Sequence, residues 1–111
     1  EPLQSGLTLS GGEPFEQSAA LMPIARAARA RGLSLWAYSG YTFEQLVADP
    51  ERRALLELLD VLVDGRFIEA QKDYRLRFKG SRNQRIIDVP ASLREGHVVC
   101  SSYDDVNQDL E

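Results

Sequence analysis

Three short polar turns carry the residues of this sequence whose types could do chemistry. The first is Ser10-Gly11-Gly12-Glu13, the second is Ser39-Gly40-Tyr41 and the third is Asp64-Gly65. Each follows a short apolar run that is typical of a buried strand. Glycine lets the main chain approach a small molecule closely, and a carboxylate beside it can receive an ammonium group. The three turns are therefore candidate binding elements.

The same turns have a purely structural interpretation, because a strand-to-helix bend often needs glycine for unusual backbone angles. The first turn is neither a Walker loop nor a G-x-G-x-x-G fingerprint. The sequence has no G-x-S-x-G motif, which argues against a Ser–His hydrolase. The one histidine, His97, and the one cysteine, Cys100, cannot form a four-ligand zinc site. We interpret both as structural or surface residues.

The elements that must position these turns alternate between strand and helix patterns. Apolar runs predict strands over residues 6–10, 33–38, 61–63 and 85–89. Helical spacing and capping signals predict three helices, which start at Ser18, after Thr42 and at Asp49-Pro50. This order predicts an α/β fold with a mainly parallel sheet, in which ligands bind beyond the carboxyl ends of the strands. All three polar turns lie at such ends.

The last third of the chain has a different pattern. Apolar and basic residues alternate over residues 74–79, which predicts a half-exposed strand. Residues 91–95 are expected to form a helical turn, and residues 101–111 a loose acidic tail. The final Leu110-Glu111 is interpreted as cloning residues. Four aromatic residues near the second strand are candidates for either core or a cofactor platform: Trp36, Tyr38, Tyr41 and Phe43.

Composition narrows the class of protein. The chain has 111 residues, which suits one domain, and a net charge of −4, which argues against nucleic-acid binding through a broad surface. One local basic patch is a candidate exception: Arg75, Arg77, Lys79, Arg82 and Arg85. No apolar run approaches the ~20 residues that span a bilayer. A single cysteine excludes an internal disulfide and suits the cytoplasm.

Four stretches, taken in order, carry a family resemblance. They are GLTLSGGEPF, LWAYSGYTFEQL, DVLVDGRFIEAQKD and LRFKGSRNQRIIDV. Together they resemble the activating proteins of anaerobic ribonucleoside-triphosphate reductase, which are radical S-adenosylmethionine (SAM) enzymes close to the pyruvate formate-lyase activating enzymes. The resemblance runs from about Gly6 to Val89. The GGE turn is shared across radical-SAM enzymes, whereas GSxNQRIID points to the reductase activases.

The resemblance implies a partial (β/α) barrel and a cytoplasmic oxidoreductase. Family enzymes use a four-iron four-sulfur (4Fe-4S) cluster, with a reductant such as flavodoxin, to cleave SAM reductively. The resulting 5′-deoxyadenosyl radical abstracts hydrogen from a glycine of the partner reductase, which is the protein substrate.

The resemblance also implies a set of SAM-site residues: Ser10, Gly11, Gly12, Glu13, Ser39, Gly40, Asp64, Asn83, Gln84 and Arg85. The glycine-rich turn would hold the amino end of the methionine moiety, and the second turn would meet the ribose or methionine part. Asp64 would line the same cleft. The last three residues match the signature stretch and are assigned to the cleft or to the partner surface.

The sequence departs from the family pattern in one respect. The family's C-x-x-x-C-x-x-C loop precedes the GGE strand and is absent from these 111 residues, and one cysteine cannot supply three thiolates to a cluster. Residues 1–100 are therefore expected to be the carboxyl-side portion of an activase domain, without a cluster and inactive alone. A strand left at the sheet edge over residues 7–9 predicts a homodimer or larger assembly.

Two alternatives remain open at this stage. The first keeps the superfamily and changes the partner, to a pyruvate formate-lyase type enzyme or the target of another radical-SAM maturase. The second is a non-catalytic remnant or protein-binding module, which the missing cysteines favour. The GSRNQRIID stretch favours the reductase as partner.

Overall fold

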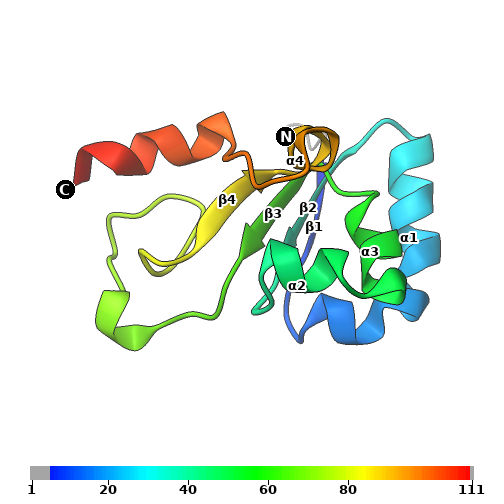
Figure 1. Cartoon of the computed structure of the whole chain (residues 1–111), viewed down its shortest axis with the longest axis horizontal. Helices are drawn as coiled ribbons and strands as arrows, with labels where there is room; N and C mark the ends of the chain where they lie inside the picture. Colours follow the sequence, from blue (N-terminus) through cyan, green and yellow to red (C-terminus); the bar gives the residue numbers. More distant parts are fainter. Residues whose placement is uncertain (1–5, 111) are drawn as a thin grey trace.

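Four short strands form one sheet in the order β1-β2-β3-β4, shown in Figure 1. The computed structural model describes residues 6–110. The strands are β1 (Gly6–Leu9), β2 (Ser34–Tyr38), β3 (Val61–Asp64) and β4 (Arg85–Asp88). The α-helices are α1 (Ser18–Ala30), α2 (Phe43–Val47), α3 (Pro50–Leu56) and α4 (Val89–Glu95). Three 3-10 helices complete the chain: η1 (Pro14–Gln17), η2 (Glu69–Gln71) and η3 (Ser102–Leu110).

Strands β1, β2 and β3 are parallel, and β4 is antiparallel to β3. Leu7 lies opposite Leu35, and Trp36 lies opposite Val61. The expected mixed α/β fold with a mainly parallel sheet is therefore confirmed. Because β4 runs the other way, it begins at the edge where the three parallel strands end. That edge gathers the polar turns.

Local sequence explains most helix starts. The Thr42 hydroxyl accepts from the Gln45 amide and the Gln45 side chain accepts from the Thr42 amide, so the predicted capping box is confirmed at α2. Asp49 caps α3, as predicted, with Pro50 in the first turn. Helix α1 starts at Ser18, as predicted, but the expectation that Ser18 caps it is wrong, because the N-cap residue is Gln17. Ser18 lies inside the helix and donates to the Phe15 carbonyl, because η1 begins the turn earlier.

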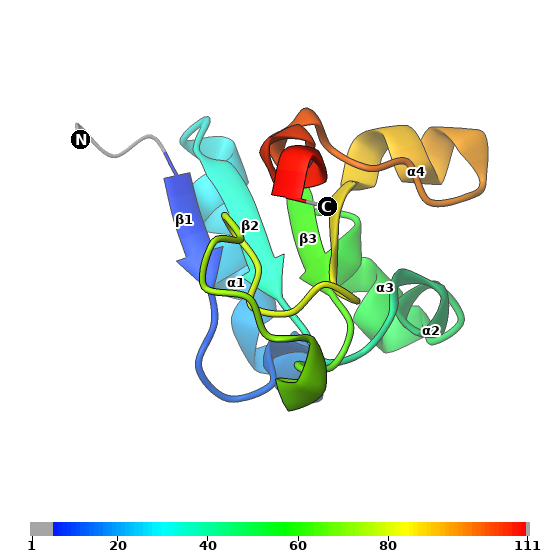
Figure 2. The ribbon, with the colours of Figure 1, turned by 90° about the vertical axis from the view of Figure 1, so that its left-hand side faces the viewer.

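The sheet has two unlike faces. Helices α1, α2 and α3 cover one face, as Figures 1 and 2 show. Between them lies the main core, which includes Leu35, Leu62 and Ile87, all fully buried. The other face carries Trp36 and Tyr38 beside a smaller buried cluster of valine and isoleucine. Chain segments 66–84 and η3 lie on this second side.

The strand predicted over residues 74–79 is wrong. Phe78 adopts a left-handed φ of 71°, which a strand cannot continue through. Residues 99–101 also occupy the edge of β4 that faces away from β3. There the Asp88 amide donates to the Val99 carbonyl, and the Ser101 amide donates to the Ile86 carbonyl. With this edge of β4 taken, residues 72–84 form a hydrogen-bonded loop instead.

The carboxyl end also differs from the expectation of a loose tail. Residues of η3 pack on the sheet, where Tyr103 contacts the rings of Trp36 and Phe78 at centroid distances of 4.9 and 5.5 Å. The Asn107 amide bonds both main-chain groups of Arg77. These contacts order the segment. Over residues 6–110, no helix has the length and apolar character needed to cross a membrane.

Candidate functional site

Two adjoining hollows open at the edge where β1, β2 and β3 end. The larger has a volume of about 860 Å³ and the smaller about 260 Å³. Glu13, Gly40 and Gly65 line both. The two hollows therefore meet between the first, second and third polar turns, as expected for a sheet with parallel strands.

Glu13 is the hydrogen-bonding centre of this edge. Its Oε2 accepts from the Phe15 amide at 3.1 Å and from the Ser39 hydroxyl at 2.8 Å. Its Oε1 accepts from the Gly40 amide at 2.8 Å. The Ser39 hydroxyl also accepts from the Tyr41 amide at 3.0 Å. A single carboxylate thus fastens the turn after β1 to the turn after β2, while Oε1 keeps room for a further donor.

Glycine is required at two positions of this edge. Gly11 has a φ of 93° and Gly65 has a φ of 98°, which side-chain-bearing residues rarely adopt. A Cβ at Gly65 would lie 3.7 Å from the Asn83 side-chain nitrogen, an ordinary contact, so the backbone angle is what requires glycine there. Gly11 lies in open space, with nothing near its missing Cβ. Its role is therefore conformational, and it leaves the main chain exposed along the smaller hollow.

A charge cluster closes the far side of the larger hollow. Asp64, whose side chain is 1% exposed, accepts two bonds from Arg85 at 3.0 and 2.6 Å. It also accepts from the Phe43 amide at 2.7 Å, which fixes the start of α2. Arg85 reaches Glu44 at 2.8 Å, and this contact lowers the pKa of Glu44. Asp64 borders the hollow, but its oxygens are engaged within the protein.

The two amides of the signature stretch hold the main chain of the neighbouring loop. Gln84 accepts from the amides of Gly80 and Ser81 and donates to the Gly65 carbonyl at 2.9 Å. Asn83 donates to the Arg66 carbonyl at 2.8 Å and accepts from the Ser81 hydroxyl. Both residues also line a hollow, Asn83 the larger and Gln84 the smaller.

Nine of the ten residues assigned from the sequence line one of the two hollows. Ser10 is exposed beside the first turn and lines neither. Sequence reasoning missed Arg66 and Glu16, which line the larger hollow. The position of Arg66, directly after the third turn, was the available signal.

The four aromatic residues considered in the sequence analysis lie in different parts of the structure. Phe43 is buried in the main core, and Trp36 and Tyr38 pack on the second face of the sheet. Tyr41 lines the larger hollow, with the Arg52 guanidinium 4.4 Å from its ring centroid and its hydroxyl bonded to Glu16. Among the four, Tyr41 lines the larger hollow and Tyr38 the smaller.

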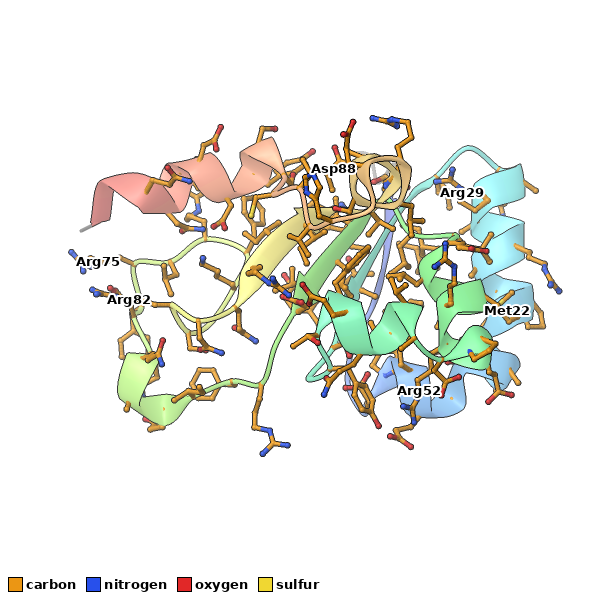
Figure 3. All side chains as sticks on the ribbon, in the orientation of Figure 1. Met22, Arg29, Arg52, Arg75, Arg82 and Asp88 are labelled. Carbon is orange, nitrogen blue, oxygen red and sulfur yellow. The ribbon has the colours of Figure 1, made fainter. Side chains whose placement is uncertain are left out.

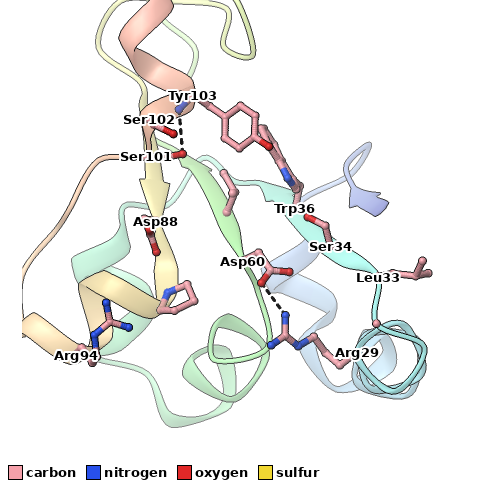
Figure 4. Close-up of a pocket in the computed structure, with 13 residues that line it drawn as sticks. Arg29, Leu33, Ser34, Trp36, Asp60, Asp88, Arg94, Ser101, Ser102 and Tyr103 are labelled. Carbon is pink, nitrogen blue, oxygen red and sulfur yellow. Dashed lines mark hydrogen bonds and ion pairs between the residues drawn. The ribbon is translucent and has the colours of Figure 1, made fainter. Parts of the chain in front are cut away.

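A third hollow, of about 810 Å³, lies at the opposite, amino ends of the strands (Figure 4). Arg29 and Asp60 form an ion pair at 2.8 Å across it. Asp60 also accepts from the Leu35 amide at 2.7 Å. Through Asp60, these bonds connect α1 to β2. We therefore interpret the residues around this hollow as a structural contact between helix and sheet.

Within residues 6–110, no group of three or more His, Cys, Asp or Glu side chains is placed to hold a metal ion. Cys100 is exposed and lies beside Ile87 of β4. Partial burial of its sulfur, with Asp104 nearby, raises the pKa of the thiol. The residues present in this chain therefore do not fit an iron–sulfur cluster.

Comparison with known proteins shows to which family the chain is similar. A family model described as a 4Fe-4S single cluster domain matches residues 1–87. The anaerobic ribonucleoside-triphosphate reductase-activating protein of Haemophilus influenzae is 38% identical over 87 residues, which cover 75% of this chain and 55% of that protein. The activating protein of the same name from Vibrio cholerae is 42% identical over 85 residues, covering 73% and 54%.

The Escherichia coli K12 protein of that name is 33% identical over 85 residues, which cover 73% of this chain and 54% of that protein. The chain thus spans about half the length of the curated relatives it matches. No solved structure matches it. The resemblance found in the four sequence stretches is confirmed by these relatives.

Proposed function

The chain belongs to the family of 4Fe-4S single cluster domains, and from this premise we propose that it is the SAM-binding portion of a glycyl-radical activating enzyme. Its partner would be the anaerobic ribonucleoside-triphosphate reductase that the relatives' names specify. Its sheet would form part of a partial (β/α) barrel. The observation that carries the proposal is the meeting of three polar turns around Glu13, at the ligand-binding edge of the sheet.

Glu13 and the two glycines before it would hold the amino end of SAM. Oε1 of Glu13 accepts one bond, from the Gly40 amide, and Glu13 lines both hollows, so this oxygen can receive an ammonium group. Exposed main chain at Gly11 and Gly12 lies beside it in the smaller hollow. Ser39 and Gly40 position the carboxylate from the second turn. Asp64 and Arg85 support the wall opposite.

When bound, SAM would supply, through its reductive cleavage, the radical that abstracts hydrogen from a glycine of the partner. The residues of this chain would bind SAM, orient its methionine end and fix the turns around it. They do not fit the cluster that the family description names, since the whole sequence contains one cysteine. No step of the reaction is therefore assigned to a cluster on this chain.

Titration calorimetry with SAM tests the binding site. We expect a dissociation constant below about 1 mM, the upper end of ordinary enzyme KM values. Glu13→Gln removes one charge-assisted hydrogen bond and should weaken binding by about 10-fold or more. Glu95→Gln, on exposed α4, is the matched control and should bind as the wild type does. Absence of binding by the folded wild-type chain at millimolar SAM would overturn the proposal.

Anaerobic reconstitution with iron and sulfide tests the assignment of the cluster. One thiol cannot hold a cluster that needs three, so we expect iron far below four per chain and no release of 5′-deoxyadenosine. Iron and sulfide analysis with chromatography of the nucleoside products measures both. A near-stoichiometric cluster that cleaves SAM would refute this prediction.

A further inference from the structure

The chain segment between β3 and β4 differs in charge from the rest of the molecule. We call residues 66–84 the basic lobe. It holds six basic and two acidic residues, a net charge of +4, whereas the rest of the chain holds seven basic and fifteen acidic residues, a net charge of −8. Figure 1 shows the lobe projecting from the sheet on the side away from α1. Positive charge is therefore concentrated on one projection of an acidic protein.

Most of this charge lies on the surface. Lys79 is the exception, because its side chain is 9% exposed and pairs with Asp104 at 3.0 Å. Five exposed bases remain against two acids: Arg66, Lys72, Arg75, Arg77 and Arg82 against Glu69 and Asp73. Glu69 pairs with Lys72 inside the lobe. An excess of three positive charges thus faces outward.

Asp73 organises the tip of the lobe. It binds Arg75 at 2.7 Å and Arg82 at 3.1 Å, and Figure 3 shows these two arginines side by side. The Arg75 guanidinium, with Arg82 beside it, holds the pKa of Asp73 well below its usual range. One acid therefore fixes the direction of two guanidinium groups at the most distant part of the lobe.

Exposed apolar side chains gather on the same segment. Of the seven large apolar side chains exposed over the described residues, four belong to the basic lobe: Phe67, Ile68, Tyr74 and Phe78. Tyr74 is 89% exposed, with the Lys72 ammonium 5.0 Å from its ring centroid. Tyrosine, phenylalanine and arginine are the residue types enriched at protein interfaces. The lobe thus combines apolar anchors with surplus positive charge.

The lobe is also pre-organised. Gln84 and Asn83 bond its main chain, as described above, and the Ser81 hydroxyl accepts from the Ile68 amide at 3.2 Å. The Tyr38 hydroxyl donates to the Phe78 carbonyl at 2.9 Å. A fixed surface loses less conformational entropy when it binds a partner. The lobe also reaches the candidate site, because Phe67 lines the smaller hollow and Arg66 the larger.

We propose that the basic lobe is a docking surface for an acidic segment of a protein partner that carries an exposed aromatic or aliphatic side chain. Charge complementarity would orient the segment, and Phe67 and Tyr74 would anchor it beside the hollows. A protein segment suits this surface better than nucleic acid, because the surrounding body carries a net charge of −8 and would repel a long phosphate backbone. That this segment belongs to the reductase rests on the proposed function.

The test follows the amide resonances of the whole ¹⁵N-labelled chain as each of three probes is added. These are a synthetic peptide of alternating Glu and Tyr, a peptide of alternating Lys and Tyr, and a single-stranded oligonucleotide. The two peptides share the same tyrosine content and differ in the sign of their charge, and the oligonucleotide is a second negatively charged probe. We expect the Glu-Tyr peptide alone to shift amide resonances of residues 66–84, with affinity that falls as salt rises. The double variant Arg77→Gln/Arg82→Gln should weaken binding by about 2- to 30-fold.

Arg26→Gln/Arg31→Gln, in α1 and at its C-cap, removes the same charge from exposed positions and should leave affinity unchanged. Tyr74→Ser removes the most exposed aromatic without touching the core and should also weaken binding. Equal losses in both arginine pairs, shifts outside the lobe, tighter binding of the oligonucleotide or no binding of the Glu-Tyr peptide would each overturn the proposal. If the reductase fails to bind while the Glu-Tyr peptide maps to the lobe, the docking surface stands and the proposed partner falls.

Discussion

Among the single residues of the candidate site, Asp64 is a buried carboxylate whose oxygens are engaged within the protein. Its two oxygens accept bonds from Arg85 and from the Phe43 amide. It therefore fixes the start of α2 and the wall of the larger hollow. Glu13 differs, because its Oε1 accepts a single bond and the residue lines both hollows. The two acids, at the ends of β1 and β3, thus have separate tasks.

Arg85→Gln should destabilise the chain. It would leave the Asp64 carboxylate buried without its charge partner, which costs about 3–5 kcal/mol in a fully buried pair. Because the Arg85 side chain is 34% exposed, we expect about 2–3 kcal/mol, measured as the free energy of unfolding in urea. The loss should also raise the pKa of Glu44 toward its ordinary value, since Arg85 lowers it.

Two control variants test whether the loss of stability comes from the buried, unpaired Asp64 carboxylate or from the loss of any ion pair. Asp64→Asn/Arg85→Gln removes both charges and should recover part of the lost stability. Arg53→Gln breaks an exposed pair with Glu57 and should change the free energy of unfolding by less than about 1 kcal/mol. Equal losses for Arg85→Gln and Arg53→Gln would contradict the structural role of Asp64.

At the level of elements, sequence patterns predicted what depends on local chemistry. The capping box at Thr42, the Asp49-Pro50 start and the apolar runs of β2 and β3 all depend on neighbouring residues. The strand predicted over residues 74–79 failed because strand formation needs a free partner edge. Residues 99–101 occupy that edge of β4, which no local pattern reveals.

For the candidate site, too, the sequence predicted the features that depend on local residues and not those that depend on tertiary contacts. Glycine after each of the three apolar runs, with an acid in the first and third turns, indicated which turns meet, because parallel strands end at one edge. The bonds that occupy Asp64, Asn83 and Gln84 were not predictable, since each reaches a group whose position depends on the folded loop. Sequence thus indicated which residues gather there, and tertiary contacts decided which of them are occupied.

Gln84→Ala should loosen the basic lobe while the sheet stays intact. The change removes three hydrogen bonds to main-chain groups, and we expect the local opening free energy near Gly80 and Ser81 to fall by about 1–3 kcal/mol. Hydrogen exchange of the Gly80 and Ser81 amides measures it. Gln71→Ala, at an exposed position of η2, should leave their protection unchanged. Unchanged exchange in Gln84→Ala would refute the role of Gln84.

For the molecule as a whole, the position of β1 matters most for association. Among the described residues β1 pairs with β2 alone, so its other edge presents unpaired main-chain groups. Leu7 and Leu9 hold β1 on the main core, so the groups that this edge presents belong to the main chain. We therefore propose that the chain self-associates through β1.

Sedimentation velocity tests this association. At tens of micromolar, a rough working range for exposed edges, we expect species larger than a monomer. Thr8→Pro removes the amide of an exposed residue in β1 and should shift the distribution toward monomer. Arg77→Gln/Arg82→Gln serves as the control and should not. A wild-type chain that stays monomeric at this concentration would contradict the proposal.

The lobe leaves and re-enters the sheet at one point, because Asp64 and Arg85 are opposed across β3 and β4 and also form an ion pair. A short turn can join two antiparallel strand ends at such a pair. A change in the length of the lobe tip therefore need not shift the strand register, provided that Asn83 and Gln84 keep their bonds to the main chain. Recognition of a partner could diversify there while the edge around Glu13 stays constant.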